Sequence, residues 1–187
     1  MKTILVIAEK GGVGKTMLAD EIMFSLERSG IRAAFYEFDR QGGELHTGAP
    51  ITDPEVNVVD TPGFVLEGRD AWIEDADVVV IPTVAGGKAE MQPFISTLVA
   101  CCEKGKQVAV VFNKKQRRFN TSKALEKALK ELPFRVTLLS IPMSEDLPNA
   151  SLKDMSVVQY RKRGDAAKAV LTTVNEIRKM AGVDPEE

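Results

Sequence analysis

The chain has 187 residues, of which 44% are hydrophobic and 28% are charged, as expected for one soluble domain with one core. No apolar run approaches the roughly 20 residues that a membrane-spanning helix needs, and the chain opens on a strand pattern, not on a signal peptide.

The net charge is −2, and the charged residues are distributed unevenly along the chain. Residues 1–100 hold 8 Lys and Arg against 16 Asp and Glu, whereas residues 101–187 hold 17 against 11. This asymmetry permits contact with a polyanion on one face. The two adjacent cysteines, Cys101 and Cys102, cannot form a disulfide framework, which favours a reducing cytoplasm.

Apolar, strand-like segments alternate with helical patterns along the chain. The predicted strands are Thr3–Ala8, Arg32–Phe38, Val56–Asp60, Asp77–Ile81, Gln107–Phe112 and Phe134–Ile141, and the predicted helices are Lys15–Ser29, Lys88–Lys104, Thr121–Glu131 and Asp165–Ala181. Such alternation is typical of right-handed crossovers between parallel strands, with helices on both faces of one sheet. We therefore predict an α/β fold in a single domain, residues 1–183, with six mostly parallel strands. The expected strand order is 2-3-1-4-5-6, which sets the strand that ends at Asp60 beside the first strand. The acidic tail Asp184–Glu187 is expected to fray.

The segment Glu9–Thr16 reads EKGGVGKT and follows the apolar run Ile4–Ala8. A buried strand that leads through a glycine-rich turn into a helix is the setting of a phosphate-binding loop (P-loop). The glycines let the backbone point several N–H groups at one anion. Lys15 can reach the outer phosphates of a nucleotide, and the Thr16 hydroxyl can ligate Mg²⁺. The motif predicts a P-loop NTPase, and Lys10 adds a second cation inside the loop.

Asp60 and Asp39 each end a predicted strand. Asp60 opens the turn Thr61-Pro62-Gly63, and a carboxylate at this end of a parallel strand faces the ligand crevice, where it can hold a Mg²⁺-bound water. The turn suits a switch that rearranges when a γ-phosphate is present, and the alternative is a plain strand-end turn. Asp39 can orient the attacking water for in-line phosphoryl transfer, or it serves only as a helix N-cap or turn residue.

Together these segments resemble the ParA/MinD group of deviant Walker ATPases. The loop Lys10–Thr16 matches the group's signature, Glu37–Gln41 resembles its D-x-D-P-Q segment, and Asp60–Gly63 resembles its Mg²⁺-linked switch. The segments that begin at Ile81-Pro82 and Ile141-Pro142 also resemble ParA proteins. The resemblance therefore covers nearly the whole chain.

The resemblance implies ATP and Mg²⁺ as cofactors and slow ATP hydrolysis coupled to formation of a homodimer. Lys10 would reach across the dimer to the partner's nucleotide, Lys15 would hold the β- and γ-phosphates, and Asp39 would activate water. A cation from a second subunit neutralises charge on the transferring phosphoryl group, as an arginine finger does. Thr16 would bind the metal directly and Asp60 would bind it through a water. The implied nucleotide-binding residues are Gly11, Gly12, Val13, Gly14, Lys15, Thr16, Met17, Asn113 and Pro142.

Four positions depart from the family pattern. Glu9 stands where the general P-loop pattern has its first glycine, and Met17 stands where many relatives have a second threonine. Glu37 and Arg40 replace an aspartate and a proline. Only 20 residues separate the two strand-end aspartates, so the region that helps to engage a partner is shorter than in typical ParA proteins.

The end of the fifth predicted strand bears on the choice of base. Asn113 stands where the family uses an asparagine to contact adenine. GTPases have the motif Asn-Lys-x-Asp at this place, and its aspartate binds the donor edge of guanine. Gln116 occupies the aspartate's position here, so the sequence favours ATP over GTP.

Basic residues form two clusters in the second half of the chain: Lys114, Lys115, Arg117 and Arg118, and then Arg161, Lys162 and Arg163. Short charge runs are often only solvated loops. The alternative is sequence-independent DNA binding through phosphate contacts, which a dimer would strengthen. The resemblance to ParA proteins favours that alternative. His46, the only histidine, has no ligand-spaced partner and is expected to be exposed.

The resemblance favours a ParA-like role in partitioning plasmid, chromosomal or mobile-element DNA, with a ParB-like or transfer-system protein as partner. The acidic tail argues against the basic amphipathic membrane anchor of MinD relatives, so we expect no membrane partner. A nucleotide-gated scaffold that recruits or regulates a partner protein without binding DNA is the main alternative. A metabolic P-loop kinase is a third option, although no second substrate pocket is recognisable in the sequence.

Overall fold

The computed structural model describes residues 1–38, 46, 51–63, 68–116 and 120–186, apart from the side chains of residues 88–90. The strands are β1 (Lys2–Val6), β2 (Ala33–Glu37), β3 (Val56–Asp60), β4 (Val78–Thr83), β5 (Gln107–Lys115) and β6 (Thr137–Pro142). The helices are α1 (Lys15–Arg28), α2 (Arg69–Asp75), α3 (Lys88–Glu103), α4 (Asn120–Lys130), α5 (Asp146–Ser151), α6 (Val157–Tyr160) and α7 (Asp165–Met180).

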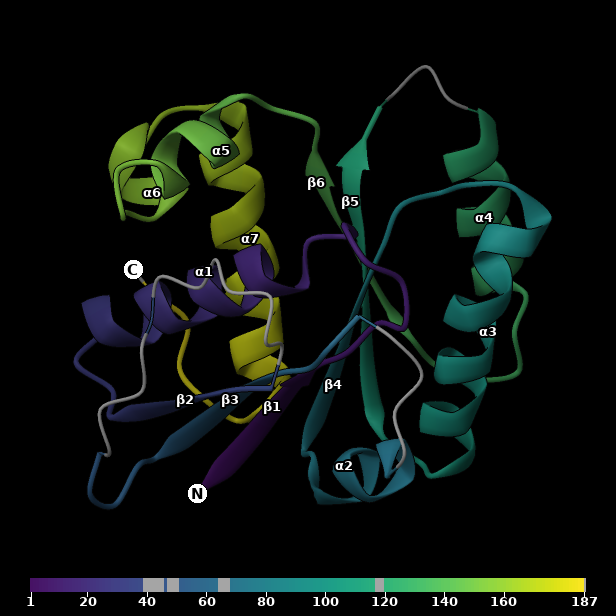
Figure 1. Cartoon of the computed structure of the whole chain (residues 1–187), viewed down its shortest axis with the longest axis horizontal. Helices are drawn as coiled ribbons and strands as arrows, with labels where there is room; N and C mark the ends of the chain where they lie inside the picture. The colour runs from purple at the N-terminus through teal and green to yellow at the C-terminus, as the bar shows by residue number, and fades with distance from the viewer. Residues whose placement is uncertain (39–45, 47–50, 64–67, 117–119, 187) are drawn as a thin grey trace.

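The described strands form one six-stranded sheet in the order β2-β3-β1-β4-β5-β6, and every neighbouring pair is parallel. This result confirms the predicted fold class and strand order. In Figure 1 the sheet runs through the middle of the molecule, with β1 and β4 at its centre. Because parallel strands end at the same edge of a sheet, the segments after β1, β3 and β5 meet there.

β1 shows how the sequence distributes its side chains between the two faces. Successive side chains of a strand point to opposite faces. Ile4 and Val6 accordingly join a core with residues of α1, α6 and α7, whereas Leu5 and Ile7, the residue that follows β1, join a core with residues of α2, α3 and α4. All four are at most 1% exposed, and burial of each stabilises the fold by about 1.5–3 kcal/mol. Helices therefore cover both faces, as the near-continuous Val and Ile content of the strands predicts.

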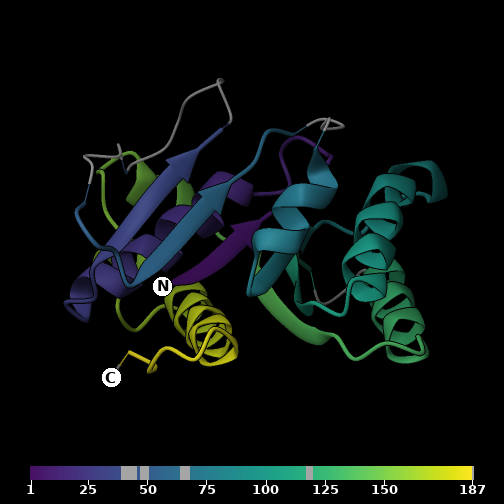
Figure 2. The ribbon, with the colours of Figure 1, turned by 90° about the horizontal axis from the view of Figure 1, so that it is seen from below.

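Three short helices have no predicted counterpart. α2, α5 and α6 contain 7, 6 and 4 residues, too few for a helical repeat to be recognised in the sequence. The four predicted helices occur as α1, α3, α4 and α7. Figure 2 shows α2 next to β1 and shows α3 beside α4 at one end of the molecule.

Buried polar contacts join α7 to α1. Arg178 is 1% exposed, and its Nη1 donates to the Ser25 carbonyl at 3.0 Å, the Ser25 hydroxyl at 2.8 Å and the Ser29 hydroxyl at 3.0 Å. A buried charge is tolerated only when such acceptors surround it. Arg178 therefore fixes the two helices that cover one face of the sheet.

The expected fraying of the acidic tail stays a prediction, and Glu186 within it makes two specific contacts. Its carboxylate pairs with Arg28 at 2.6 Å, and its backbone N–H donates to the Asn175 side chain at 2.7 Å. These contacts tie the segment to α1 and α7, whereas Glu187 lies outside the described residues.

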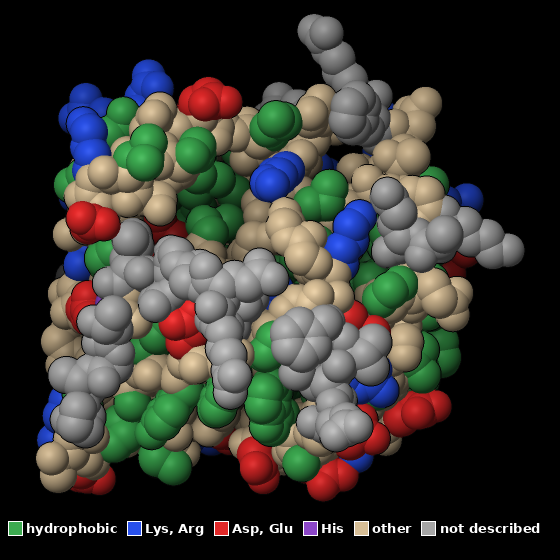
Figure 3. Space-filling model, in the orientation of Figure 1, with side chains coloured by type: hydrophobic (Ala, Val, Ile, Leu, Met, Phe, Trp, Pro, Cys, Tyr) green, Lys and Arg blue, Asp and Glu red, His purple; other side chains and the backbone are tan. Residues whose placement is uncertain are grey.

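The charges are distributed unevenly over the surface. In Figure 3, Lys and Arg side chains gather over the corner that α5 and α6 occupy, whereas several Asp and Glu side chains lie at the edge near α2. None of the helices in the described segments combines the length and the apolar character that crossing a lipid bilayer requires.

Candidate nucleotide-binding site

The loop between β1 and α1 has the backbone that an anion site needs. Gly12 and Gly14 have φ angles of 72° and 93°, in the left-handed region that favours glycine. Gly14 is the N-cap of α1, and Lys15 is the first helical residue and 5% exposed. Backbone N–H groups in such turns and at a helix N-terminus favour a bound anion. The loop can therefore cradle phosphate groups.

β3 brings Asp60 to the start of α1. In the parallel register of β1 and β3, Asp60 lies opposite Val6, whose carbonyl accepts 3.2 Å hydrogen bonds from both the N–H and the hydroxyl of Thr61. The Thr16 hydroxyl donates to the fully buried Asp60 carboxylate at 2.7 Å. A hydroxyl and a carboxylate are hard oxygen ligands of the kind that Mg²⁺ prefers. These residues therefore fit a Mg²⁺ ion.

Gly63 places the predicted switch directly against the P-loop. A Cβ atom at Gly63 would lie 3.1 Å from Lys15 Nζ and 3.2 Å from Gly11 Cα. Pro62, the residue before it, is buried. A side chain at Gly63 would therefore displace the Lys15 amine, which is expected to bind phosphates. This close approach explains why a glycine stands at position 63.

The end of β5 is tied to the P-loop by two consecutive side chains. Asn113 Nδ2 donates to the Val13 carbonyl at 2.8 Å, and Lys114 Nζ donates to the Gly12 carbonyl at 3.2 Å. Lys114 has a φ angle of 52°, which is uncommon for a residue with a side chain, and its N–H donates to Asn113 Oδ1 at 2.9 Å. The sequence predicts an adenine contact for Asn113 and a DNA contact for Lys114, whereas the structure places both on the P-loop.

Met17 and Pro142 lie at the borders of hollows near this edge of the sheet. Met17 lines a small cavity of about 90 Å³ between α1 and α5. Pro142 ends β6 and lines a cavity of about 480 Å³ together with Ser144 and Arg163. Gln116 donates to Met143 Sδ at 3.0 Å, so its amide is directed to the segment that follows Pro142.

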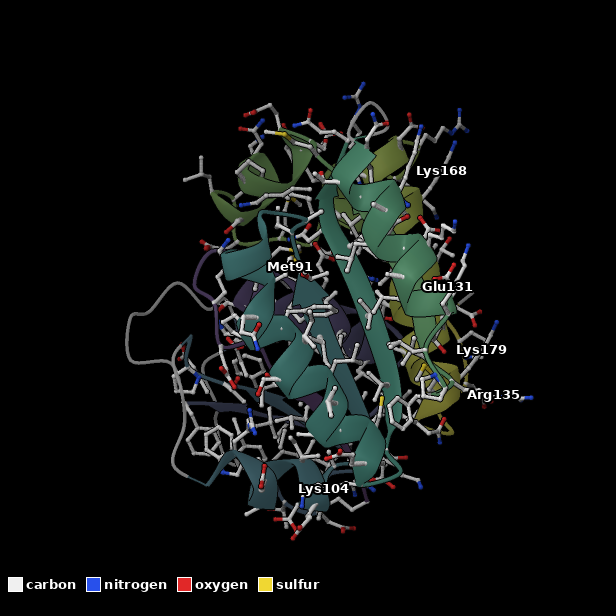
Figure 4. The ribbon with its side chains drawn as sticks, turned by 90° about the vertical axis from the view of Figure 1, so that its right-hand side faces the viewer. Met91, Lys104, Glu131, Arg135, Lys168 and Lys179 are labelled. Atoms are coloured by element: carbon white, nitrogen blue, oxygen red, sulfur yellow. The ribbon has the colours of Figure 1, made fainter. Side chains whose placement is uncertain are left out.

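Two of the predicted DNA-binding residues form ion pairs within the chain. Lys115 pairs with Glu126 of α4 at 3.0 Å, and Arg161 pairs with Asp146 of α5 at 3.2 Å. Lys162 and Arg163 are exposed. Further cations that the sequence analysis did not single out, Lys168, Lys179 and Arg135, lie along one side of the molecule in Figure 4.

Three predicted site residues lie outside the described part of the chain. They are Asp39, Arg117 and Arg118. The proposed activation of water by Asp39 therefore stays a prediction.

The expectation that His46 is exposed is wrong. Its side chain is 9% exposed, with Nδ1 2.8 Å from Asp20 Oδ1 and Nε2 3.3 Å from Glu27 Oε2. The ring also contacts Phe24, with ring centroids 4.3 Å apart. Burial opposes protonation of the imidazole, but the hydrogen bond to Asp20 and the charge of Glu27 outweigh it and raise the pKa of His46.

Sequence reasoning missed a contact of the first P-loop residue. Glu9 Oε1 accepts from Arg69 Nη1 at 2.6 Å and from the Thr97 hydroxyl at 3.3 Å, and the Glu9 side chain is 9% exposed. The only signal in the sequence is a carboxylate where the general P-loop pattern has glycine.

The comparisons with known proteins agree with this geometry. A model of the family described as the CobQ/CobB/MinD/ParA nucleotide binding domain matches residues 4–157, whereas no curated protein sequence matches the chain. Among solved structures, the septum site-determining protein MinD of Pyrococcus horikoshii, complexed with Mg-ADP, aligns with a TM-score of 0.72 and 14% identity over 97% of each chain.

Two further structures align over most of their length. An ATP complex of a McdA variant from Cyanothece has a TM-score of 0.74 and 15% identity over 98% of this chain and 97% of the McdA chain. A putative plasmid partition protein of Borrelia burgdorferi, bound to AMPPNP, has a TM-score of 0.67 and 14% identity over 92% of this chain and 97% of the other. At such low identities the likeness shows a shared fold.

Proposed function

We infer the function of this chain from its family, because it belongs to the CobQ/CobB/MinD/ParA nucleotide-binding domain family. We propose that it is a Mg²⁺-dependent ATPase that forms a homodimer when ATP is bound and hydrolyses ATP slowly in that dimer. The observation that carries the proposal is the 2.7 Å contact of Thr16 with Asp60, beside the 5% exposed Lys15. This contact brings Asp60 of β3 next to Lys15 and Thr16 of α1. Groups that a triphosphate and its metal require therefore meet from separate segments of the chain.

We propose adenine as the base. Gln116 stands where GTPases have a carboxylate, and its amide is directed to Met143, so it offers guanine no anionic acceptor. The three solved structures compared above hold Mg-ADP, ATP and AMPPNP, which is consistent with this choice.

In the proposed reaction, Lys15 binds the β- and γ-phosphates, while Thr16 and Asp60 hold Mg²⁺. The metal, when bound, neutralises phosphate charge that would oppose attack by water. Lys10 crosses the dimer and adds a second positive charge at the transferring phosphoryl group of the partner's nucleotide. Asp39 orients the attacking water. Hydrolysis then requires the dimer, because a monomer lacks the second lysine.

Calorimetric titration and steady-state turnover test these roles. Lys15→Ala is expected to abolish ATP binding, and Asp39→Ala to bind ATP and stay dimeric while losing turnover. Lys10→Ala is expected to keep some ATP binding but lose hydrolysis. Lys2→Ala is the matched control. Lys2 is exposed, pairs with Asp77 and lies at the end of β1 that is remote from the P-loop. Hydrolysis at the wild-type rate by Lys10→Ala would refute the proposal that each subunit donates Lys10 to the nucleotide of its partner.

We propose partitioning or positioning of DNA as the biological role, with a ParB-like or transfer-system protein as partner. The exposed Lys162 and Arg163 and the cations along the side shown in Figure 4 support contact with DNA phosphates. The likeness to a plasmid partition protein also favours this role.

A second candidate is a nucleotide-gated scaffold that regulates a partner protein without binding DNA. It is favoured by the internal partners of three predicted DNA-binding residues: Lys114 on a P-loop carbonyl, Lys115 with Glu126, and Arg161 with Asp146. These contacts compete with phosphate for the same amines and guanidinium.

Filter binding with random duplex DNA, with and without ATP, separates the two candidates. Tight, ATP-dependent binding that weakens with salt supports DNA partitioning, and the variant with Lys162→Glu and Arg163→Glu should then bind more weakly than a Lys2→Glu control. No binding at low salt supports the scaffold.

A further inference from the structure

We propose that Glu9 and Arg69 form a latch that positions Lys10 and couples the P-loop to helix α2. This inference rests on the proposed function, because it assigns Lys10 to a neighbouring subunit's nucleotide. Neither residue touches the phosphates in this account; both are positioning residues that act through Lys10.

The latch is well defined by its contacts. Glu9 Oε1 accepts from Arg69 Nη1 at 2.6 Å and from the Thr97 hydroxyl at 3.3 Å. The same Arg69 nitrogen lies 3.4 Å from the Ser96 hydroxyl. Thr97 is fully buried, and the Glu9 side chain is 9% exposed. The first residue of the P-loop is therefore anchored to both α2 and α3 by partly buried contacts.

The anchor fixes the backbone from which Lys10 departs. Lys10 follows Glu9 directly, so the conformation of Glu9 sets the starting point and direction of the Lys10 side chain. The loop has glycines at the next two positions, which impose little restraint of their own. An anchored Glu9 compensates for that freedom at the residue from which the Lys10 backbone continues.

Arg69 also neutralises a carboxylate that would otherwise disfavour the ligand. A free Glu9 carboxylate would repel a triphosphate and compete with it for the Lys10 amine. Mg²⁺ and Lys15 neutralise most of the charge of a bound triphosphate in the proposed site. For about one remaining unit charge about 10 Å away and an effective dielectric constant of about 20, Coulomb's law gives roughly a tenfold loss of affinity. Pairing with Arg69 removes most of this penalty.

The position of Arg69 connects the latch to the proposed switch. Arg69 is the first residue of α2, which lies next to β1 in Figure 2 and comes six residues after Gly63. Gly63 in turn lies against Lys15 and Gly11. Arg69 therefore stands close in sequence to the glycine that contacts the P-loop.

The experiment compares Arg69→Met, the double variant Glu9→Gln with Arg69→Met, and Arg69→Lys. Arg69→Met should weaken ATP binding about tenfold and lower kcat at least tenfold, because it frees the Glu9 charge and the loop. The double variant should regain wild-type affinity within about twofold, because the repelling charge is gone, but keep the low kcat, because Lys10 stays unanchored. Arg69→Lys should recover part of kcat. Asp70→Asn is the control, since Asp70 contacts Arg69 from an exposed position on the same helix.

Hydrogen exchange of the nucleotide-free proteins gives a readout that does not depend on ATP. The amides of residues 9–16 should exchange faster in Arg69→Met than in wild type or Asp70→Asn. Unchanged exchange, or a double variant with wild-type kcat, would overturn the latch while leaving the proposed function intact. A wild-type protein that binds no ATP would instead overturn the proposed function itself.

Discussion

Replacing Gly14 by alanine tests how closely β5 is tied to the P-loop. The φ angle of Gly14 is 93°, and a Cβ atom there would overlap the side-chain amide nitrogen of Asn113. That nitrogen donates to the Val13 carbonyl in a buried hydrogen bond. Gly14→Ala therefore combines backbone strain with loss of the contact that joins the two segments.

The two costs can be estimated separately. A residue with a side chain in the left-handed region costs about 1–2 kcal/mol, and a buried acceptor that loses its donor costs about 1–3 kcal/mol. Together they predict a loss of about 2–5 kcal/mol in the free energy of unfolding. For a protein of this size each kcal/mol lowers Tm by about 2–4 °C, so Tm should fall by about 4–20 °C.

Thermal and urea unfolding of four variants isolate the overlap. Gly30→Ala measures backbone strain alone, because Gly30 has a φ angle of 69° and its Cβ would meet nothing within 4 Å. Asn113→Ala measures the lost hydrogen bond, and the Gly14→Ala, Asn113→Ala double variant should lose less than the sum of the single variants. The predicted overlap between a Cβ atom at Gly14 and the Asn113 side chain would be refuted by two results together. The losses of the single variants would add up in the double variant within about 0.5 kcal/mol, and Gly14→Ala would lose no more stability than Gly30→Ala.

Three other substitutions have defined outcomes. Gly63→Ala should weaken ATP binding about tenfold while changing Tm little, because its Cβ would displace the Lys15 amine 3.1 Å away; unchanged affinity in calorimetry contradicts that contact. Arg178→Ala should lower the free energy of unfolding in urea by about 3–5 kcal/mol, because two buried hydrogen bonds and one partly buried hydrogen bond are lost and a cavity remains. The exposed Lys179→Ala is its control, and an equal loss in both variants would contradict this role of Arg178. The raised pKa of His46 means that its charged form stabilises the fold below about pH 6.5 and that this contribution is lost as pH rises through the folded-state pKa. The Tm of wild type minus that of His46→Gln should therefore decrease between pH 5 and pH 8.5, and a constant difference would exclude the ion pairs with Asp20 and Glu27.

The parts of the fold that follow from short-range pattern were predictable from the sequence. The sequence identifies the first strand by the apolar run Ile4–Ala8, the turn by the glycines that follow it, and the start of the helix by Lys15. These signals could be read together because each lies within a few residues of the next. The parallel sheet follows from the alternation of strands and helices, and the chemistry that requires Asp60 beside Thr16 sets the third strand next to the first. The 2.7 Å contact of those two residues agrees with that expectation.

Contacts between distant residues with no periodic signal could not be predicted. Glu9 and Arg69 are 60 positions apart, and Asn113 and Val13 are 100 apart, so only the folded chain reveals them. His46 illustrates the same limit, because a lone histidine in a polar segment gives no sign of the carboxylates of α1 that surround it. The roles of Asp39 and of the cluster at Arg117 and Arg118 stay predictions.

Sedimentation velocity of the wild-type chain with Mg²⁺ and a non-hydrolysable ATP analogue tests the central claim most directly. With the analogue, the chain should sediment as a dimer of about twice its mass of 20.5 kDa, and with ADP or without nucleotide it should sediment as a monomer. A chain that binds the analogue yet sediments as a monomer at every concentration would contradict the central claim, because Lys10 would then have no second nucleotide to reach.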